Sequence, residues 1–123
     1  MGTMKESILI VDDDIINLKL AGMILSQHGY EVYQAKSGLD ALGFLRRKSV
    51  DLILLDVAMP VMNGLKTLEK IRKDKNLAYV PVILLTASAD SETVIEACRL
   101  EISDYIKKPY TPEQLLERVW KAL

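Results

Sequence analysis

The chain has 123 residues, of which 50% are hydrophobic and 27% are charged, a composition typical of one globular domain and not of a disordered or fibrous protein. Sixteen basic and seventeen acidic residues leave a net charge of −1, without the basic excess expected of a domain that binds nucleic acid or anionic membranes. The single cysteine, Cys98, excludes an internal disulfide and a metal site built from cysteines.

The two ends of the chain indicate no membrane or export segment. No apolar run approaches the ~20 residues that cross a bilayer, and the first residues lack the apolar stretch of a secretory signal. We therefore expect a cytoplasmic protein. Residues 1–5 are interpreted as a leader, in which residues 1–3 were added during cloning and Met4 is the native start, and residues 6–123 as the domain.

In the first half of the chain, short apolar runs alternate with helix-length segments. The β-branched run at 8–11 predicts a strand buried on both faces, and the apolar segment 15–27, which Gly29 stops, predicts a helix. A shorter strand is predicted at 31–35. Residues 37–40 resemble a capping box that opens a second helix with leucines at helical spacing behind it.

The second half repeats this alternation. Strands are predicted at 52–55, 80–85 and 105–107, and helices at 65–73, at 93–100 and from Thr111, where Pro112 and Gln114 complete a capping pattern. Five successive strand–helix units predict an α/β fold with a doubly wound parallel sheet and helices on both faces. In such sheets ligands bind at the carboxyl ends of the strands.

Acidic side chains follow two of these strands, since Asp12, Asp13 and Asp14 come after the first and Asp56 ends the third. Two carboxylates ~4 Å apart repel by about 1 kcal/mol in water and by about 4 kcal/mol at an effective dielectric constant of 20. A hard divalent cation such as Mg²⁺ relieves this repulsion, whereas the absence of His and Cys from these positions disfavours zinc.

The remaining strand ends supply a hydroxyl at Thr86 and ammonium groups at Lys107 and Lys108. A metal ion and Lys108 neutralise the oxygens of a phosphoryl group, and Thr86 donates a hydrogen bond to it. A carboxylate also serves as a nucleophile that forms an aspartyl phosphate. Asp56, at the tip of the central strand, is the best placed carboxylate for this role.

Several residues have simpler structural interpretations. Asp14 is predicted to cap the helix that follows it, and His28 to end that helix. Cys98, at helical spacing from Val94, is predicted to fill the core. For Trp120 the sequence leaves two interpretations open, internal packing and a partner surface.

The chain resembles the receiver domain of two-component response regulators, the CheY-like superfamily, over nearly its whole length. The resemblance rests on four motifs that are weak singly and specific together, namely residues 8–14 (ILIVDDD), 55–64 (LDVAMPVMNG), 85–87 (LTA) and 104–109 (DYIKKP). It implies the flavodoxin-like, CheY-like fold, with five parallel strands in the order 2-1-3-4-5 and five helices.

The resemblance also implies roles for single residues. Asp56 is the phosphoacceptor, and Mg²⁺ (or Mn²⁺) is held by Asp13 and Asp56 directly, by Asp12 mainly through water and by the backbone carbonyl of Ala58. Lys108 pairs with one phosphoryl oxygen and Thr86 hydrogen-bonds another. The peptide bond before Pro109 is expected to be cis, and Pro60 and Gly64 are expected to shape the loop after the acceptor.

A switch follows from these roles. The phosphoryl group draws Thr86 inward, the aromatic ring of Tyr105 turns inward, and the face formed by the fourth helix, fifth strand and fifth helix changes shape. Three departures from the family pattern are expected to matter. Ala58 and Ser88 occupy positions that tune the lifetime of the phosphorylated state, and residues 101–104 replace a more usual Gly-Ala pair. Lys107 is expected to point away from the cleft.

The resemblance implies a signalling module of a two-component system or phosphorelay, not an enzyme beyond its own phosphorylation and dephosphorylation. The expected partners are a sensor histidine kinase or histidine phosphotransfer protein and a downstream effector or fused output domain. This domain itself is expected to bind neither nucleic acid nor membrane, and a homodimer through the last two helices and the fifth strand is plausible.

Three other functions are compatible with a strand-end aspartate or with this topology. A haloacid-dehalogenase-type phosphatase needs a second acid two residues after its nucleophile, where this chain has Ala58. A flavin-binding module needs a phosphate loop rich in Ser, Thr or Gly after the first strand, where this chain has three aspartates. A degenerate receiver that acts only through protein contacts would have lost key positions that are filled here.

Overall fold

The structure, a computed structural model, describes residues 5–87 and 91–123. Residues 1–4 of the expected leader and Ser88, one of the two expected lifetime positions, lie outside the described residues. Strands and helices alternate in the order β1 (Ser7–Val11), α1 (Ile15–Gln27), β2 (Glu31–Ala35), α2 (Gly38–Arg47), β3 (Leu52–Asp56), α3 (Gly64–Lys73), β4 (Val82–Thr86), α4 (Ser91–Arg99), β5 (Asp104–Lys107) and α5 (Pro112–Ala122).

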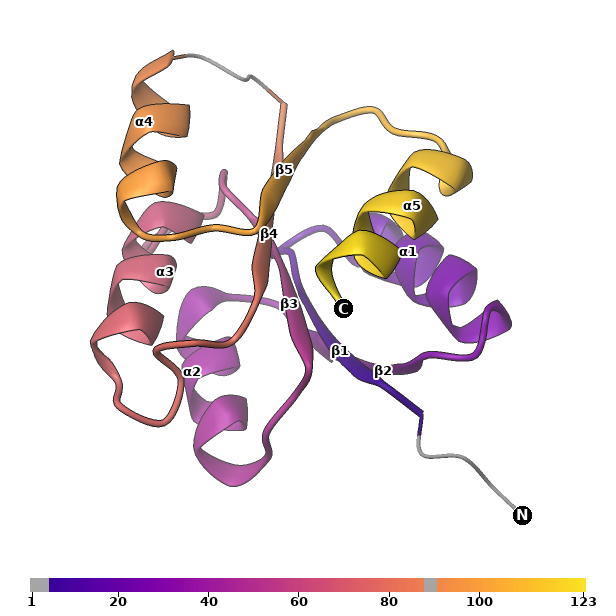
Figure 1. The fold of residues 1–123 in the computed structure, drawn as a ribbon, viewed down its shortest axis with the longest axis horizontal. Helices are drawn as coiled ribbons and strands as arrows, with labels where there is room; N and C mark the ends of the chain where they lie inside the picture. Colours follow the sequence, from indigo (N-terminus) through magenta and orange to yellow (C-terminus); the bar gives the residue numbers. More distant parts are fainter. Residues whose placement is uncertain (1–4, 88–90) are drawn as a thin grey trace.

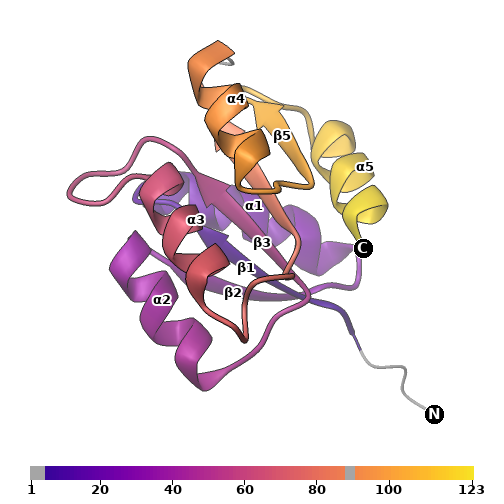
Figure 2. The same ribbon diagram turned by 60° about the vertical axis from the view of Figure 1, so that its left-hand side comes forward.

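The strands form one parallel sheet in the order β2-β1-β3-β4-β5, which confirms the predicted fold class. Helices α1 and α5 cover one face of the sheet, and α2, α3 and α4 cover the other (Figures 1 and 2). The winding direction reverses between β1 and β3, because the chain passes from β1 outward to β2 and then returns past β1 to β3. The carboxyl ends of β1 and β3 therefore flank the crevice where ligands bind in such sheets.

The core consists of two apolar layers, one on each face of the sheet. Every residue of β3 and β4 is buried, which explains why these strands appear in the sequence as continuous apolar runs without polar alternation. Each layer joins one side of the strands to the apolar stripe of its helices, so the sheet is a fixed platform for the side chains at its edge.

Side-chain caps define the helix ends. The Asp14 carboxylate accepts hydrogen bonds from the backbone N–H groups of Ile16 and Asn17, which confirms the predicted cap of α1. Thr111 and Gln114 form the predicted capping box at the start of α5, and His28 ends α1. Each of these caps satisfies backbone donors or acceptors that the helix itself leaves unpaired.

The sequence expectations were wrong for the start of β4, for Cys98 and for the start of α4, which begins at Ser91 and not at residue 93. Strand β4 begins at Val82 and not at Val80, because Pro81 has no N–H to donate to the ladder, although its carbonyl accepts from the Ile53 N–H at 3.0 Å. Cys98 is exposed and does not fill the core. Its neighbour Ala97 is fully buried, so the face of α4 that packs on the core includes position 97 and not position 98.

None of the helices in residues 5–87 and 91–123 is long and apolar enough to cross a membrane. Trp120 has 74% of its surface exposed, so of its two interpretations the structure excludes internal packing.

Glu101, in the turn between α4 and β5, has a φ of +58°, a left-handed conformation that costs an L-residue roughly 1–2 kcal/mol and glycine almost nothing. Glu101→Gly is expected to raise the free energy of unfolding by about 0.5–1 kcal/mol, because the added freedom of glycine in the unfolded chain offsets part of the gain. Urea denaturation with an unchanged m-value checks this. Ser103→Gly, also exposed but without a positive φ, is the control and should lower stability; an equal loss in both variants would contradict the prediction.

Candidate functional site

Four polar side chains meet at the carboxyl edge of the sheet, where β1, β3, β4 and β5 end. Val11 pairs with Leu55 in the ladder, so Asp12 and Asp56, which follow these two residues in the chain, lie side by side. Both are buried, with 2% and 4% of their surface exposed. Thr86 ends β4 and is also buried. The sequence expectation that acidic and hydroxyl groups converge at this edge is confirmed.

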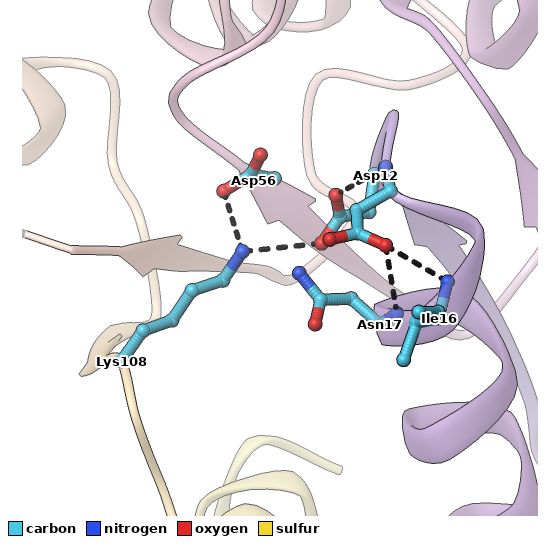
Figure 3. Close-up of polar contacts among 6 residues, drawn as sticks. Asp12, Ile16, Asn17, Asp56 and Lys108 are labelled. Carbon is cyan, nitrogen blue, oxygen red and sulfur yellow. Dashed lines mark hydrogen bonds and ion pairs between the residues drawn. The ribbon is translucent and has the colours of Figure 1, made fainter.

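Lys108 reaches this cluster from the end of β5. Its Nζ lies 2.9 Å from Asp56 Oδ1 and 3.1 Å from Asp12 Oδ2, so one ammonium bridges the two buried carboxylates (Figure 3). Its backbone N–H donates to the Thr86 carbonyl at 2.7 Å, which fixes the start of the side chain against β4. The peptide bond between Lys108 and Pro109 is cis, as the resemblance implied. Lys107 is exposed, in agreement with the expectation that it points away from the cleft.

Asp13 completes an acidic triad with Asp12 and Asp56. One carboxylate oxygen from each of these residues lies within 4.8 Å of the others, a spacing compatible with a shared metal ion. Asp13 is exposed while the other two are buried, so the triad opens to solvent on one side. The donors are all oxygens, the set that Mg²⁺ prefers. Asp14 is not part of the triad, because its carboxylate caps α1.

Burial raises the pKa of Asp56, and the negative charges of Asp12 and Asp13 raise it further, against the lowering effect of Lys108. Burial lowers the pKa of Lys108, but the hydrogen bonds and charges of Asp56 and Asp12 outweigh this effect and raise it overall. Asp56 is therefore a carboxylate whose charge is only partly compensated, and an additional cation at the triad would stabilise it.

Lys108→Met is expected to raise the pKa of Asp56 further, because it removes the hydrogen bond and the positive charge that lower it. A carboxyl group with a folded-state pKa above its unfolded value binds more protons when folded, so the free energy of unfolding falls as pH rises through that interval. The decline in the free energy of unfolding from about pH 4 towards neutrality should be steeper in the variant. NMR titration of the Asp56 carboxyl carbon and urea denaturation at several pH values check both effects.

The neighbouring variant Lys107→Met is the matched control, since Lys107 is exposed and its side chain forms no hydrogen bond or ion pair with the residues that the structure describes. It should leave the titration of Asp56 unchanged. A normal or lowered pKa of Asp56 in Lys108→Met would contradict the balance of charges described above.

The loop after Asp56 is packed closely against the end of β3. The Gly64 N–H donates to the Val57 carbonyl at 2.8 Å, and a Cβ at position 64 would lie 2.3 Å from the Asp56 carbonyl oxygen. Asn63 caps α3 by accepting from the Lys66 N–H, and Val61 has a φ of +68°. The left-handed conformation of Val61 was not predicted, because valine gives no sequence signal for it.

The expected switch residues occupy β4 and β5 side by side. Thr86 pairs in the ladder with Lys107, two residues after Tyr105, and Tyr105 has 37% of its surface exposed. On the far side of β5, Arg118 of α5 donates to the Tyr105 carbonyl at 2.9 Å and to the Asp104 carboxylate at 3.1 Å. The backbone at Tyr105 is therefore held from α5 while its side chain is partly open to solvent.

Helix α1 presents an apolar face beside the site that the sequence analysis did not single out. Ile16, Leu20 and Met23 are 67%, 55% and 55% exposed. Leu20 and Ile24 also line a groove that continues to Lys108, Pro109 and Tyr110. The sequence pattern does not reveal this face, because apolar residues lie on both the buried and the exposed sides of α1.

Comparison of the sequence with known proteins finds response regulators and their receiver domain. The model of the response regulator receiver domain family matches residues 8–120. The transcriptional regulatory protein ZraR of Salmonella typhimurium is 41% identical over 119 residues, which are 97% of this chain and 26% of that protein. The DNA-binding response regulator MtrA of Mycobacterium tuberculosis is 35% identical over 119 residues, or 97% of this chain and 51% of that protein. The chain thus spans about half or less of the length of these relatives.

Comparison with solved structures finds CheY-like proteins of the same fold. The chemotaxis protein CheY4 of Vibrio cholerae superposes with a TM-score of 0.94 at 30% identity, covering 98% of this chain and 100% of that one. A CheY-like receiver domain protein from Methanospirillum hungatei superposes with a TM-score of 0.90 at 32% identity, covering 96% of this chain and 93% of that one.

Proposed function

The chain belongs to the response regulator receiver domain family of two-component systems, and from this premise we propose that Asp56 is its phosphoacceptor. The donor is a phosphohistidine of a sensor kinase or of a histidine phosphotransfer protein. The observation that supports the proposal is the position of Asp56, buried at the tip of β3 within an acidic triad and 2.9 Å from Lys108 Nζ. The chain acts as a signalling switch, and its only chemistry is its own phosphorylation and dephosphorylation.

In the proposed transfer, a carboxylate oxygen of Asp56 attacks the phosphorus atom of the donor. The new P–O bond forms as the P–N bond to the donor imidazole breaks, and the imidazole keeps the electron pair and takes a proton. Lys108 Nζ, which bridges Asp12 and Asp56 before transfer, then pairs with a phosphoryl oxygen. Thr86 donates its hydroxyl to a second oxygen. These donors are held by strand ends before the reaction, so little reorganisation is needed.

The triad fits a divalent cation by its donor set and spacing. Mg²⁺ or Mn²⁺ would be held by Asp13 and Asp56 directly, by Asp12 mainly through water, and by the carbonyl of Ala58. When bound, the ion supplies positive charge next to the phosphoryl oxygens. The exposed position of Asp13 leaves an open side through which an ion and a donor can approach.

Phosphorylation is proposed to change the face formed by α4, β5 and α5. The phosphoryl group adds about two negative charges and three acceptor oxygens. It draws in the Thr86 hydroxyl, and the partly exposed Tyr105 ring turns towards the space that opens behind Thr86. Only contacts that differ between the two states shift their populations, and moving a 1:99 ratio to 99:1 requires roughly 5.5 kcal/mol.

Two surfaces of the chain are proposed to bind its partners. The apolar face of α1 lies next to the acceptor, and we assign to it the docking of the donor protein. The α4–β5–α5 face is assigned to an effector, to a fused output domain or to a second copy of the chain. The net charge of −1 gives this domain no electrostatic basis for binding DNA, so a DNA-binding output like that of MtrA would belong to another domain.

Incubation with acetyl phosphate tests the proposal, with intact-mass spectrometry as the readout. The expected result is addition of one phosphoryl group in the presence of Mg²⁺ and none after chelation. Formation of a beryllofluoride adduct, followed by NMR shifts at Thr86 and Tyr105, is the parallel measurement. Absence of both labelling and adduct in Mg²⁺ would refute the phosphoacceptor function and leave a receiver that acts only through protein contacts.

A further inference from the structure

Arg72, near the end of α3, holds five backbone carbonyls with its guanidinium. Nε donates to the Leu100 carbonyl at 2.8 Å and Nη2 to the Glu101 carbonyl at 3.0 Å, so the planar fork binds two consecutive carbonyls just after α4. On its other side, Nη1 donates to the carbonyls of Val80, Ala78 and Leu77 at 2.7, 3.2 and 3.4 Å in the connection between α3 and β4.

No carboxylate pairs with Arg72 among the residues that the structure describes; its partners there are carbonyl oxygens only. Burial lowers the pKa of its guanidinium, and the Glu101 charge offsets part of this effect, yet arginine stays protonated in proteins. Hydrogen bonds from a charged donor contribute more to stability than those between neutral groups. A guanidinium bonded to five backbone carbonyls therefore fixes backbone positions strongly without adding a second charge.

The backbone that Arg72 holds leads directly into the expected switch strand. Residues 101–104 are the stretch that departs from the family pattern, and Glu101 there adopts its left-handed conformation with its carbonyl on Arg72. The junction is also tied to the sheet, because the Ser103 N–H donates to the Val82 carbonyl at 2.8 Å. Tyr105 follows two residues later. Arg72 thus links α3, which starts beside the acceptor loop, to the entry of β5.

We propose that Arg72 is a positioning residue for the switch, whose guanidinium fixes the junction of α4 and β5 (residues 100–103) so that a displacement at Thr86 reaches Tyr105. Without this anchor the junction would absorb the displacement by local fluctuation. The transmission from Thr86 to Tyr105 rests on the proposed phosphoacceptor function. The anchoring of residues 100–103 does not, since it is a property of the unphosphorylated chain.

Three variants test it. Arg72→Met keeps the apolar stem and removes every donor, whereas Arg72→Lys keeps the charge and loses the fork that binds two carbonyls at once. Arg47→Met is the matched control, because Arg47 is exposed on α2 and its side chain forms no hydrogen bond or ion pair with the residues that the structure describes. Amide hydrogen exchange is measured by NMR without any phosphodonor at residues 100, 101 and 103, whose N–H groups are bonded to Ala97, Cys98 and Val82.

The expected result is exchange at these three amides about tenfold faster or more in Arg72→Met, an intermediate increase in Arg72→Lys and none in Arg47→Met. Amides of β1 and β3 should keep their protection. With saturating beryllofluoride and Mg²⁺, the shift of the Tyr105 ring resonance between free and bound protein should fall below about half of the parent value in Arg72→Met and recover partly in Arg72→Lys.

Two results would overturn the inference. The first is hydrogen exchange in Arg72→Met that is either faster by the same factor at all amides or unchanged at all of them. Uniformly faster exchange would assign Arg72 to general stability, and unchanged exchange would show that Arg72 does not anchor the junction. The second is a full Tyr105 response in Arg72→Met despite faster exchange at the junction, which removes the role in transmission. If the parent chain forms no adduct, the proposed function and the transmission role fail together, while the exchange measurement still decides the anchoring.

Discussion

Asp56→Asn is expected to take up no phosphoryl group from acetyl phosphate under conditions in which the parent chain is labelled. The carboxamide has no anionic oxygen to attack phosphorus, and Asp12 and Asp13 follow β1, whereas the proposed acceptor Asp56 ends the central strand β3. Labelling should fall at least a hundredfold, to the background of the assay. Intact-mass spectrometry after incubation with acetyl phosphate and Mg²⁺ measures it, and circular dichroism confirms the fold.

The same variant should be at least as stable as the parent chain at neutral pH. Burial raises the pKa of Asp56, so the fold disfavours its ionised form, and a neutral side chain removes a charge that lowers the free energy of unfolding above about pH 4. Asp14→Asn is the matched control, because Asp14 lies near the triad but serves as a helix cap that asparagine also forms. It should keep full labelling. Persistent labelling of Asp56→Asn would transfer the acceptor role to another residue.

The site was predictable because its parts depend on strand ends, and strand ends depend on hydrophobic pattern. The run at 8–11 places Asp12 at the tip of β1, the run at 52–55 places Asp56 at the tip of β3, and a parallel sheet brings both tips to one edge. The bridge from Lys108 to both carboxylates follows from the same logic once β5 is placed beside β4. Periodicity and the rules for parallel sheets placed these residues at one edge, and the strand order that the resemblance implied placed β1 beside β3 and β5 beside β4.

Other features were not predictable, because they depend on contacts between distant segments. Arg72 appears in the sequence as one of several charges on the outer side of α3, and its role depends on carbonyls of residues 100 and 101, 28 and 29 positions further along. The exposure of Cys98 depends on how far α4 is rotated about its axis, which a nine-residue helix leaves open to a shift of one position. Side-chain periodicity specifies a face only to within such a shift.

Gly64→Ala is expected to destabilise the fold and to impair the site together. Its Cβ would lie 2.3 Å from the Asp56 carbonyl oxygen and 2.8 Å from the Val57 Cα, and both are backbone atoms that cannot rotate away. The loop must therefore move off the end of β3, and the free energy of unfolding should fall by about 3 kcal/mol. Because the displaced carbonyl belongs to Asp56, the proposed acceptor, we also expect the labelling rate to fall at least tenfold.

Gly43→Ala provides the comparison, since a Cβ added in α2 at position 43 meets nothing within 4 Å. That substitution should raise the free energy of unfolding by about 0.5–1 kcal/mol, as alanine does in a helix interior, and leave labelling unchanged. Urea denaturation and the acetyl phosphate assay on both variants separate the two cases. A Gly64→Ala variant with parental stability and labelling would show that the loop tolerates a side chain there. The close contact of α3 with the acceptor strand would then have no part in positioning Asp56.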